Sequence, residues 1–306
     1  MMSLSTAEAL TDALREEARR LLAEGTVAVV VGWEAGRFPN QTTPAFISDP
    51  EQAQRLVYGD YCVNTLAKYA LGEKAAGKVA VCVRGCDSRG INRMIADNQL
   101  LRDEVYLLGL PCSGMKDPAT GSLLMKCRTC TEHDAVTYDV LLGPATAAGH
   151  DGASADSSAG DSEHVSDEQR FTAVLGIEEM APEKRRALFD AAFNKCIRCY
   201  ACRKSCPCCT CRECFVDQLR AGWQGKQNNL AENRFYNITR VFHIGDRCIE
   251  CGECERACPM GLPLMALNRK MVKDLKSLFN ADDAGMTEEN SAALGRYDLG
   301  DLEEFM

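Results

Sequence analysis

The chain has 306 residues, enough for about two domains, with 18 cysteines, a formal net charge of −9 and a pI near 5.1. Its acidic balance argues against nucleic acid as a main partner. No stretch approaches the roughly 18 apolar residues that would span a bilayer, so direct membrane insertion is not expected. The start shows no secretion signal, so we expect a reducing cytoplasm, where cysteines serve metals rather than disulfides.

The first domain is expected over residues 1–143, where buried strand patterns alternate with helical ones. We expect a leading helix that stops at Gly25, strands over residues 26–31, 78–83 and 104–110, and helices over residues 50–71 and 88–100. This alternation predicts an α/β fold with a parallel sheet.

Four cysteines gather near the ends of these strands. Cys86 and Cys112 each come just after a strand, and Cys127 and Cys130 form a Cys-x2-Cys hook further on. Open α/β sheets place their sites outside the carboxyl ends of the strands. We therefore expect these four thiols to converge on one edge of the sheet.

The order of several short motifs makes this region recognisable. The motifs are Gly85-Cys86-Asp87, Leu110-Pro111-Cys112, Cys127-x2-Cys130 and the run from Tyr138 to Gly143. Their order resembles the beta-subunit family of deazaflavin-coenzyme hydrogenases and formate dehydrogenases. The resemblance continues in the run KCIRCYACRKSCPCCTCREC, which is similar to the ferredoxin insert of the formate dehydrogenase members.

In that family, cysteines in this arrangement hold a [4Fe-4S] cluster. The resemblance implies a third cluster on Cys86, Cys112, Cys127 and Cys130, with zinc or unligated structural cysteines as open alternatives. Members that reduce the deazaflavin also carry FAD and a glycine-rich flavin stretch near the N-terminus. Residues 1–77 show no such stretch, which argues against a flavin site.

Residues 144–167 are almost entirely small and polar and cannot bury a core, so we expect a flexible linker there. A second domain is expected over residues 168–280. An acidic tail, expected to be loosely ordered, follows over residues 281–306.

The second domain contains the spacing Cys-x2-Cys-x2-Cys-x3-Cys-Pro twice, which is the bacterial ferredoxin run. Three thiolates at this spacing let one loop wrap three corners of a cube, and in two-cluster ferredoxins the fourth cysteine of each run ligates the other cluster. Zinc is the alternative, but its usual paired hooks do not need a third cysteine in each loop. We predict one [4Fe-4S] cluster on Cys196, Cys199, Cys202 and Cys258 and a second on Cys248, Cys251, Cys254 and Cys206.

The interval between the two runs is long and helical in pattern. We expect helices over residues 182–194, 215–223, 229–245 and 260–278. This resembles the α-helical ferredoxins of succinate dehydrogenase iron-sulfur subunits and heterodisulfide reductase subunits. The fold class is therefore an α/β domain followed by a mainly α-helical dicluster ferredoxin domain.

Two further groups of residues surround the runs. Four extra cysteines either add a metal contact or pack near the clusters: Cys208, Cys209, Cys211 and Cys214. Basic residues either raise the cluster potentials, form a solvated rim or dock an acidic partner: Lys195, Arg198, Arg203, Lys204, Arg212, Arg247 and Arg256.

The leading hypothesis is an iron-sulfur electron-transfer subunit of a cytoplasmic multi-subunit oxidoreductase, with no catalytic residues of its own. By resemblance, its partners are a formate dehydrogenase or hydrogenase catalytic subunit and a heterodisulfide-reductase-like flavoprotein. One alternative is a flavin-containing beta subunit that itself reduces a deazaflavin or nicotinamide coenzyme. The other is a redox or oxygen sensor, which eight ferredoxin-run cysteines disfavour.

Overall fold

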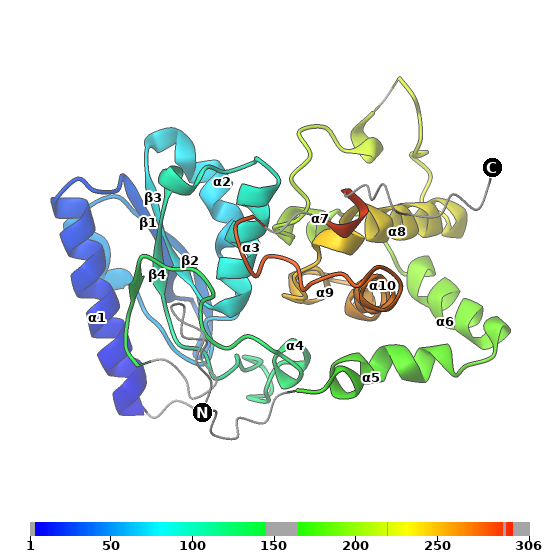
Figure 1. Ribbon diagram of the computed structural model, residues 1–306, viewed down its shortest axis with the longest axis horizontal. Coiled ribbons are helices and arrows are strands. Elements are labelled where there is room, and N and C mark those ends of the chain that lie inside the picture. The colour runs from blue at the N-terminus through cyan, green and yellow to red at the C-terminus, as the bar shows by residue number, and fades with distance from the viewer. Residues whose placement is uncertain (1–3, 145–164, 219, 290–291, 296–306) are drawn as a thin grey trace.

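A computed structural model of the chain describes residues 4–144, 165–218, 220–289 and 292–295. A sheet flanked by helices and a helical part lie side by side (Figure 1). Most of the expected linker and the end of the expected acidic tail lie outside the described residues, at 145–164 and 296–306.

The sheet has five strands in the order β2-β1-β3-β4-β5. Four of them run parallel, as predicted, but β2 pairs antiparallel with β1, so the sheet is mixed and the expectation of a wholly parallel sheet was wrong at this edge. A tight connection closes the β1–β2 hairpin, where the Gly36 amide donates to the Gln41 carbonyl at 2.8 Å. The edge position also explains how a strand can contain Pro44. The strands are β1 (Val29–Ala35), β2 (Thr42–Ile47), β3 (Val79–Val83), β4 (Val105–Gly109) and β5 (Val140–Leu141).

Helices cover both faces of the sheet, with α1 (Leu4–Ala23) on one face and α3 (Gly85–Ala96) on the other (Figure 1). The helix expected over residues 50–71 was wrong. The backbone amides of this segment bond to other elements instead. The Val57 amide donates to the Trp33 carbonyl at 2.8 Å, and the Leu66 amide donates to the Asp87 carboxylate at 2.5 Å. The segment instead forms η1 (Pro50–Arg55) and η2 (Ala67–Tyr69), followed by α2 (Ala70–Glu73) and η3 (Lys74–Ala76), with η4 (Arg102–Glu104) and α4 (Met125–Arg128) further on.

Among the described residues from 165 onward the chain forms helices and 3-10 turns without a strand. The helices expected near residues 182–194, 229–245 and 260–278 are present. The prediction of a helix over residues 215–223 was wrong. Only a 3-10 turn forms at its start, ending at Asp217, and Gly222 adopts a left-handed φ of 60°. The elements are α5 (Asp167–Glu178), α6 (Pro182–Asn194), α7 (Ala201–Ser205), η5 (Phe215–Asp217), α8 (Leu230–Ile244), η6 (Gly245–Arg247), α9 (Glu253–Arg256), α10 (Leu264–Phe279) and η7 (Ala293–Gly295).

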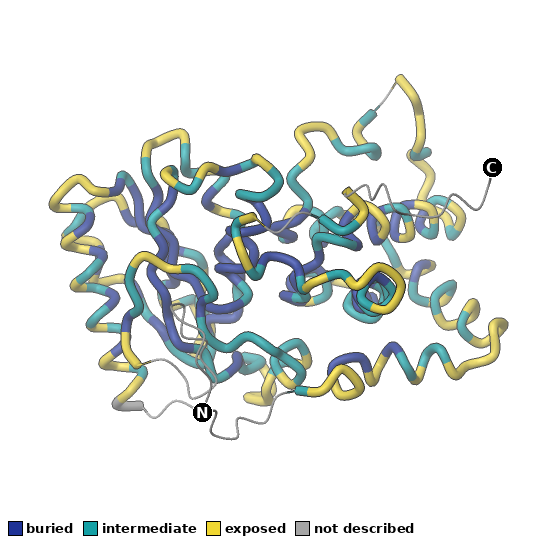
Figure 2. Tube along the Cα trace, in the orientation of Figure 1, coloured by how far each residue is buried: buried dark blue, intermediate teal, exposed yellow. Residues whose placement is uncertain are grey.

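The chain after α10 returns to the sheet part, so residues 281–289 are not the loosely ordered tail that we expected. The Arg89 guanidinium on α3 donates to the Ala284 carbonyl at 3.0 Å, and the Asn92 amide donates to the Gly285 carbonyl at 2.9 Å. Figure 2 shows the buried backbone continuing from the sheet across this junction. The two parts therefore share a packed boundary built on α3.

Within the described residues, no helix is both long and apolar enough to cross a membrane.

Candidate metal centres

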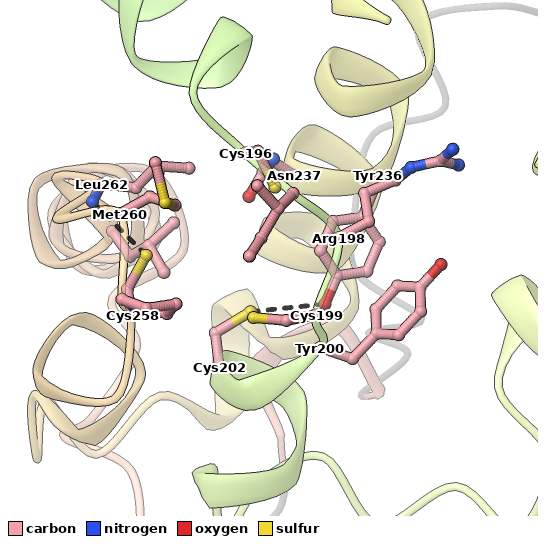
Figure 3. Close-up of a pocket in the computed structure, with 13 residues that line it drawn as sticks. Cys196, Arg198, Cys199, Tyr200, Cys202, Tyr236, Asn237, Cys258, Met260 and Leu262 are labelled. Atoms are coloured by element: carbon pink, nitrogen blue, oxygen red, sulfur yellow. Dashed lines mark hydrogen bonds between the residues drawn. The ribbon is translucent and has the colours of Figure 1, made fainter. Parts of the chain in front are cut away.

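The first thiol group brings three cysteines of the first run together with the last cysteine of the second run. Cys196, Cys199, Cys202 and Cys258 line one cavity, whose other walls are mainly apolar (Figure 3). Cys258 reaches this cavity from the loop after α9, 52 residues beyond Cys206 in the sequence. Cys258 therefore lies beside the first run, where the predicted first cluster needs it.

Side chains from helix α8 and a backbone amide orient this group. The Asn233 amide donates to the Cys196 carbonyl at 2.8 Å, and the Tyr236 hydroxyl lies 3.4 Å from the Cys202 sulfur. The Leu262 amide donates to the Cys258 sulfur at 3.5 Å (Figure 3). Hydrogen bonds to sulfur favour the thiolate, which is the form that binds a metal.

The second thiol group comprises Cys248, Cys251 and Cys254 with Cys206 from the first run, and all four are buried. Burial raises the pKa of Cys254 to about 12, and the neighbouring Cys206 sulfur adds to this rise. The Cys206 sulfur likewise raises the pKa of Cys248 and Cys251, which burial already holds above the ordinary value. The Asn268 amide of α10 donates to the Cys254 sulfur at 3.3 Å. Cys206 is thus placed beside the second loop.

The two cysteine loops share one backbone conformation. In the first loop, Arg198 and Tyr200 flank the second cysteine and have φ of 50° and 61°. In the second loop, Glu250 and Gly252 occupy the same positions and have φ of 57° and 69°. Left-handed residues are costly unless they are glycine, so three non-glycine cases at matched positions mark a shared functional geometry.

The third thiol group lies at the carboxyl ends of two strands, as predicted. Cys86 opens α3 after β3, Cys112 follows β4, Cys127 lies in α4 and Cys130 just beyond it. Burial raises the pKa of Cys86 to about 12 and the pKa of Cys112 and Cys130 to about 11. Backbone amides already point at two of the sulfurs, since the Gly114 amide donates to Cys112 and the Met115 amide to Cys127, both at 3.4 Å.

The structure explains why glycine precedes and aspartate follows the cysteine in the motif Gly85-Cys86-Asp87. A Cβ at Gly85 would lie 2.3 Å from the Glu132 carbonyl, so glycine lets the Cys130 loop approach the strand end. The Asp87 carboxylate accepts from the guanidinium of Arg84 at 2.7 Å, and both side chains are buried. This ion pair places both a carboxylate and a guanidinium close to Cys86: Asp87 adds to the rise that burial causes in the pKa of the thiol, and Arg84 opposes it.

The donor set suits an iron-sulfur cluster, because each group offers sulfur ligands. All these cysteines are buried or partly buried except Cys199, which is exposed. All 18 cysteines are free. Among the residues that the structure describes, no three His, Cys, Asp or Glu side chains stand in an arrangement that could hold a metal ion. A bound cluster would therefore require the thiols of each group to close in and lose their protons.

The match to known families lies in the segment that carries both cysteine runs. Residues 192–262 match the 4Fe-4S dicluster domain. All eight ferredoxin-run cysteines fall within this dicluster domain, so its presence, predicted from the cysteine spacing, is confirmed.

Two curated relatives share part of the chain. The F420-dependent formate dehydrogenase subunit beta of Methanocaldococcus jannaschii is 41% identical over 81 residues, which are 26% of this chain and 20% of that protein. The F420-dependent formate dehydrogenase 1 subunit beta of Methanococcus maripaludis is 29% identical over 107 residues, 35% of this chain and 28% of that protein. The matches confirm the predicted resemblance, and they span under a third of either relative.

All four extra cysteines line one pocket, and two of them also lie against the second thiol group. The neighbouring thiols of Cys208 and Cys209 hold the pKa of Cys206 well below its usual range. The Cys208 thiol donates to the Arg247 carbonyl at 2.9 Å. Cys211 and Cys214 line a pocket of about 360 Å³ together with Cys208 and Cys209. Cys208 and Cys209 are thus packed against a predicted ligand.

Several of the basic residues around the loops are engaged inside the dicluster domain. Arg203 pairs with Asp217 at 2.7 Å, Arg256 binds Glu253 at 2.7 Å, and Arg198 donates to the Gly225 carbonyl at 2.5 Å. These three side chains therefore hold the loops in place. The exposed Lys204 and Arg212 instead line the pocket that contains Cys211 and Cys214.

The three thiol groups lie in a row from the sheet part into the dicluster domain. Cys86 of the third group packs against the cluster of buried side chains that contains Cys206 and Cys251 of the second group. On the other side, Cys254 of the second group packs in the same cluster as Cys202 of the first group. The second group is therefore the middle one.

The charged and amide residues that set the thiols in place were not predicted from the sequence. Four of them contact a cysteine loop from a different element or from a distant point in the chain: Lys126, Arg240, Asn233 and Asn268. The one available signal was the polar residues at positions 233, 237 and 240, which share a face with Tyr236 on a helix that otherwise has an apolar pattern.

Proposed function

We propose that this chain is an iron-sulfur electron-transfer subunit of a multi-subunit oxidoreductase, in which three [4Fe-4S] clusters form one electron path. The first would be held by Cys196, Cys199, Cys202 and Cys258, the second by Cys248, Cys251, Cys254 and Cys206, and the third by Cys86, Cys112, Cys127 and Cys130. The single observation that carries this proposal is the order of the three thiol groups, with the second group packed between the other two.

When bound, the clusters supply one-electron oxidation and reduction. The chain's own residues bury most of the ligands and place positive charge and amide donors beside the sulfurs. Arg84 and Lys126 stand near Cys86 and oppose the effect of the Asp87 carboxylate there, and the two amides that donate to Cys112 and Cys127 act at the same centre. Positive charge and hydrogen bonds of this kind favour the reduced, more negative form of a cluster.

The partners belong to the same proposal. A formate dehydrogenase or hydrogenase catalytic subunit would stand at one end of the path and a heterodisulfide-reductase-like flavoprotein at the other. The relatives are named as subunits of F420-dependent formate dehydrogenases, which supports a place in such a complex. Domain limits of 1–143 and 168–280 and a cytoplasmic location complete the proposal.

The second candidate is a flavin-containing beta subunit that reduces the deazaflavin itself, which the names of the relatives favour. Iron, acid-labile sulfide and flavin per chain, measured on protein purified without oxygen, separate the two. About 12 iron atoms without flavin support a three-cluster electron path, whereas stoichiometric FAD supports the flavin-containing enzyme.

The third cluster is tested by substitution. Cys86→Ala is expected to lower iron by about four atoms per chain while the dicluster domain keeps its clusters. The matched control is Cys62→Ala, which removes a buried thiol of the sheet core and should leave iron unchanged. Equal iron in Cys86→Ala and the unsubstituted chain would remove the third centre.

A further inference from the structure

Arg240 on α8 lies between the first and second thiol groups. Its side chain is buried, with 3% of the residue exposed. One terminal nitrogen, Nη2, donates to the backbone carbonyl of Cys202 at 3.1 Å. The guanidinium is therefore fixed to the first loop from the inside of the domain.

The other two nitrogens of this guanidinium are not satisfied by the protein. Nε and Nη1 are buried and find no hydrogen-bond partner among the residues that the structure describes. A buried charged donor without an acceptor is strongly unfavourable. These two N–H groups therefore call for an acceptor.

Cysteines of both thiol groups act on the charge of Arg240. Burial alone would lower the pKa of Arg240, but Cys206, Cys254, Cys209 and Cys202 together raise it well above its ordinary value. Cys202 belongs to the first group, and Cys206 and Cys254 belong to the second. One guanidinium thus contacts the first loop and interacts electrostatically with predicted ligands of two centres.

Arginine suits this position better than lysine. Its planar fork carries five N–H donors and keeps its charge in a buried site, so it can hold a carbonyl and two further acceptors at once. A lysine ammonium is a compact point charge with three donors at the end of a flexible stem.

Resting on the two dicluster centres of the proposed function, we propose that Arg240 donates Nε–H and Nη1–H to sulfurs of both clusters and raises the reduction potential of each. Reduction adds one negative charge to a cluster, and a fixed positive charge with N–H donors stabilises that reduced form. Because the residue acts on both centres, one side chain sets part of the potential of each.

The test is an anaerobic redox titration of the full chain followed by electron paramagnetic resonance. In Arg240→Met both dicluster potentials are expected to shift to more negative values with iron content unchanged. In Arg240→Lys the shift is expected to be smaller, because the charge stays while donors are lost. The matched control is Arg234→Met on the same helix, where the arginine pairs with Asp190, and there no shift is expected.

Three results would overturn the proposal. The first is unchanged potentials in an iron-replete Arg240→Met, and the second is a shift confined to one cluster. The third is loss of iron in both Arg240→Met and Arg240→Lys, which would make the residue a structural support. If only Arg240→Met loses iron, the potentials of Arg240→Lys decide. A negative shift of both supports the proposal, and unchanged potentials overturn it. Failure of the proposed function is seen separately, as fewer than about eight iron atoms in the unsubstituted chain.

Discussion

The Lys126 ammonium donates to the Glu253 carboxylate at 3.0 Å, joining the cysteine hook of the sheet part to the second cysteine loop. Lys126 precedes Cys127, and Glu253 lies between Cys251 and Cys254. The side chains are 10% and 3% exposed. Two predicted cluster sites thus share one buried ion pair across the boundary between the two parts.

Lys126→Met should destabilise the protein. It leaves a buried carboxylate held by Arg256 alone, and breaking a buried ion pair costs about 3 kcal/mol, equivalent to a Tm lowered by roughly 5 °C or more. Thermal unfolding of the anaerobically purified protein measures this. The control Arg55→Gln removes a partly exposed pair with Glu34 and should change stability by about 1 kcal/mol or less. Recovery of Tm in Lys126→Met/Glu253→Gln would show that the unpaired carboxylate causes the loss, and no recovery would contradict it.

Gly252→Ala tests how closely the second cysteine loop packs against Lys126. A Cβ at Gly252 would lie 2.8 Å from the Lys126 Cβ, and the residue has a φ of 69°. Gly261 has a φ of 61° but nothing within 4 Å of such a Cβ. Both alanine variants carry a left-handed strain of about 1 kcal/mol, so Gly252→Ala should have the lower Tm. Equal Tm values would mean that Lys126 moves aside without loss.

Gly90→Ala should destabilise the boundary even though alanine is the better helix former. The new Cβ would lie 2.9 Å from the Ala67 Cβ and 3.3 Å from Pro207 and Ile249, the last two on the cysteine loops. Gly176 on α5 has nothing within 4 Å, so Gly176→Ala should stabilise by about 0.5–1 kcal/mol. The expected result is Tm changes of opposite sign, and a gain in both would show that α3 is loosely packed.

The segment after α10 should loosen in acid. Burial alone would raise the pKa of Asp283, but the hydrogen bonds and charge of Arg170 hold it at about 2. In the unfolded chain it is about 3.9, so the carboxylate adds about 2 kcal/mol above pH 4 that is lost as the pH falls toward 2.

The measurement for Asp283 is the Tm difference between the unsubstituted protein and Asp283→Asn. It should be constant from pH 7 to 4 and clearly smaller at pH 3, where the unsubstituted carboxylate loses part of its advantage. The control is Asp282→Asn at the exposed neighbour, which should show little difference at either pH. A difference that does not shrink in acid would assign the effect to packing.

Regular helices and parallel strands could be predicted because each carries its period locally. The helix expected over residues 182–194 is α6, and the strand expected over residues 78–83 is β3 within one residue. Residues 50–71 could not be predicted, since their apolar spacing resembles a helix while their backbone partners, Trp33 and Asp87, come from other elements. The edge strand β2 alternates only partly and contains a proline, so its local pattern was weak.

The sequence by itself determined the chemistry of this protein, because the spacing of eight cysteines and their following prolines is a local property that a loop of fixed length must satisfy. Only the tertiary structure decided how the thiol groups stand to one another. Their order depends on the return of residues 281–289 to α3, on the closeness that Gly90 allows, and on the pairing of Lys126 with Glu253. Such contacts join residues up to 195 positions apart, as Arg89 and Ala284 show, and no local pattern encodes them.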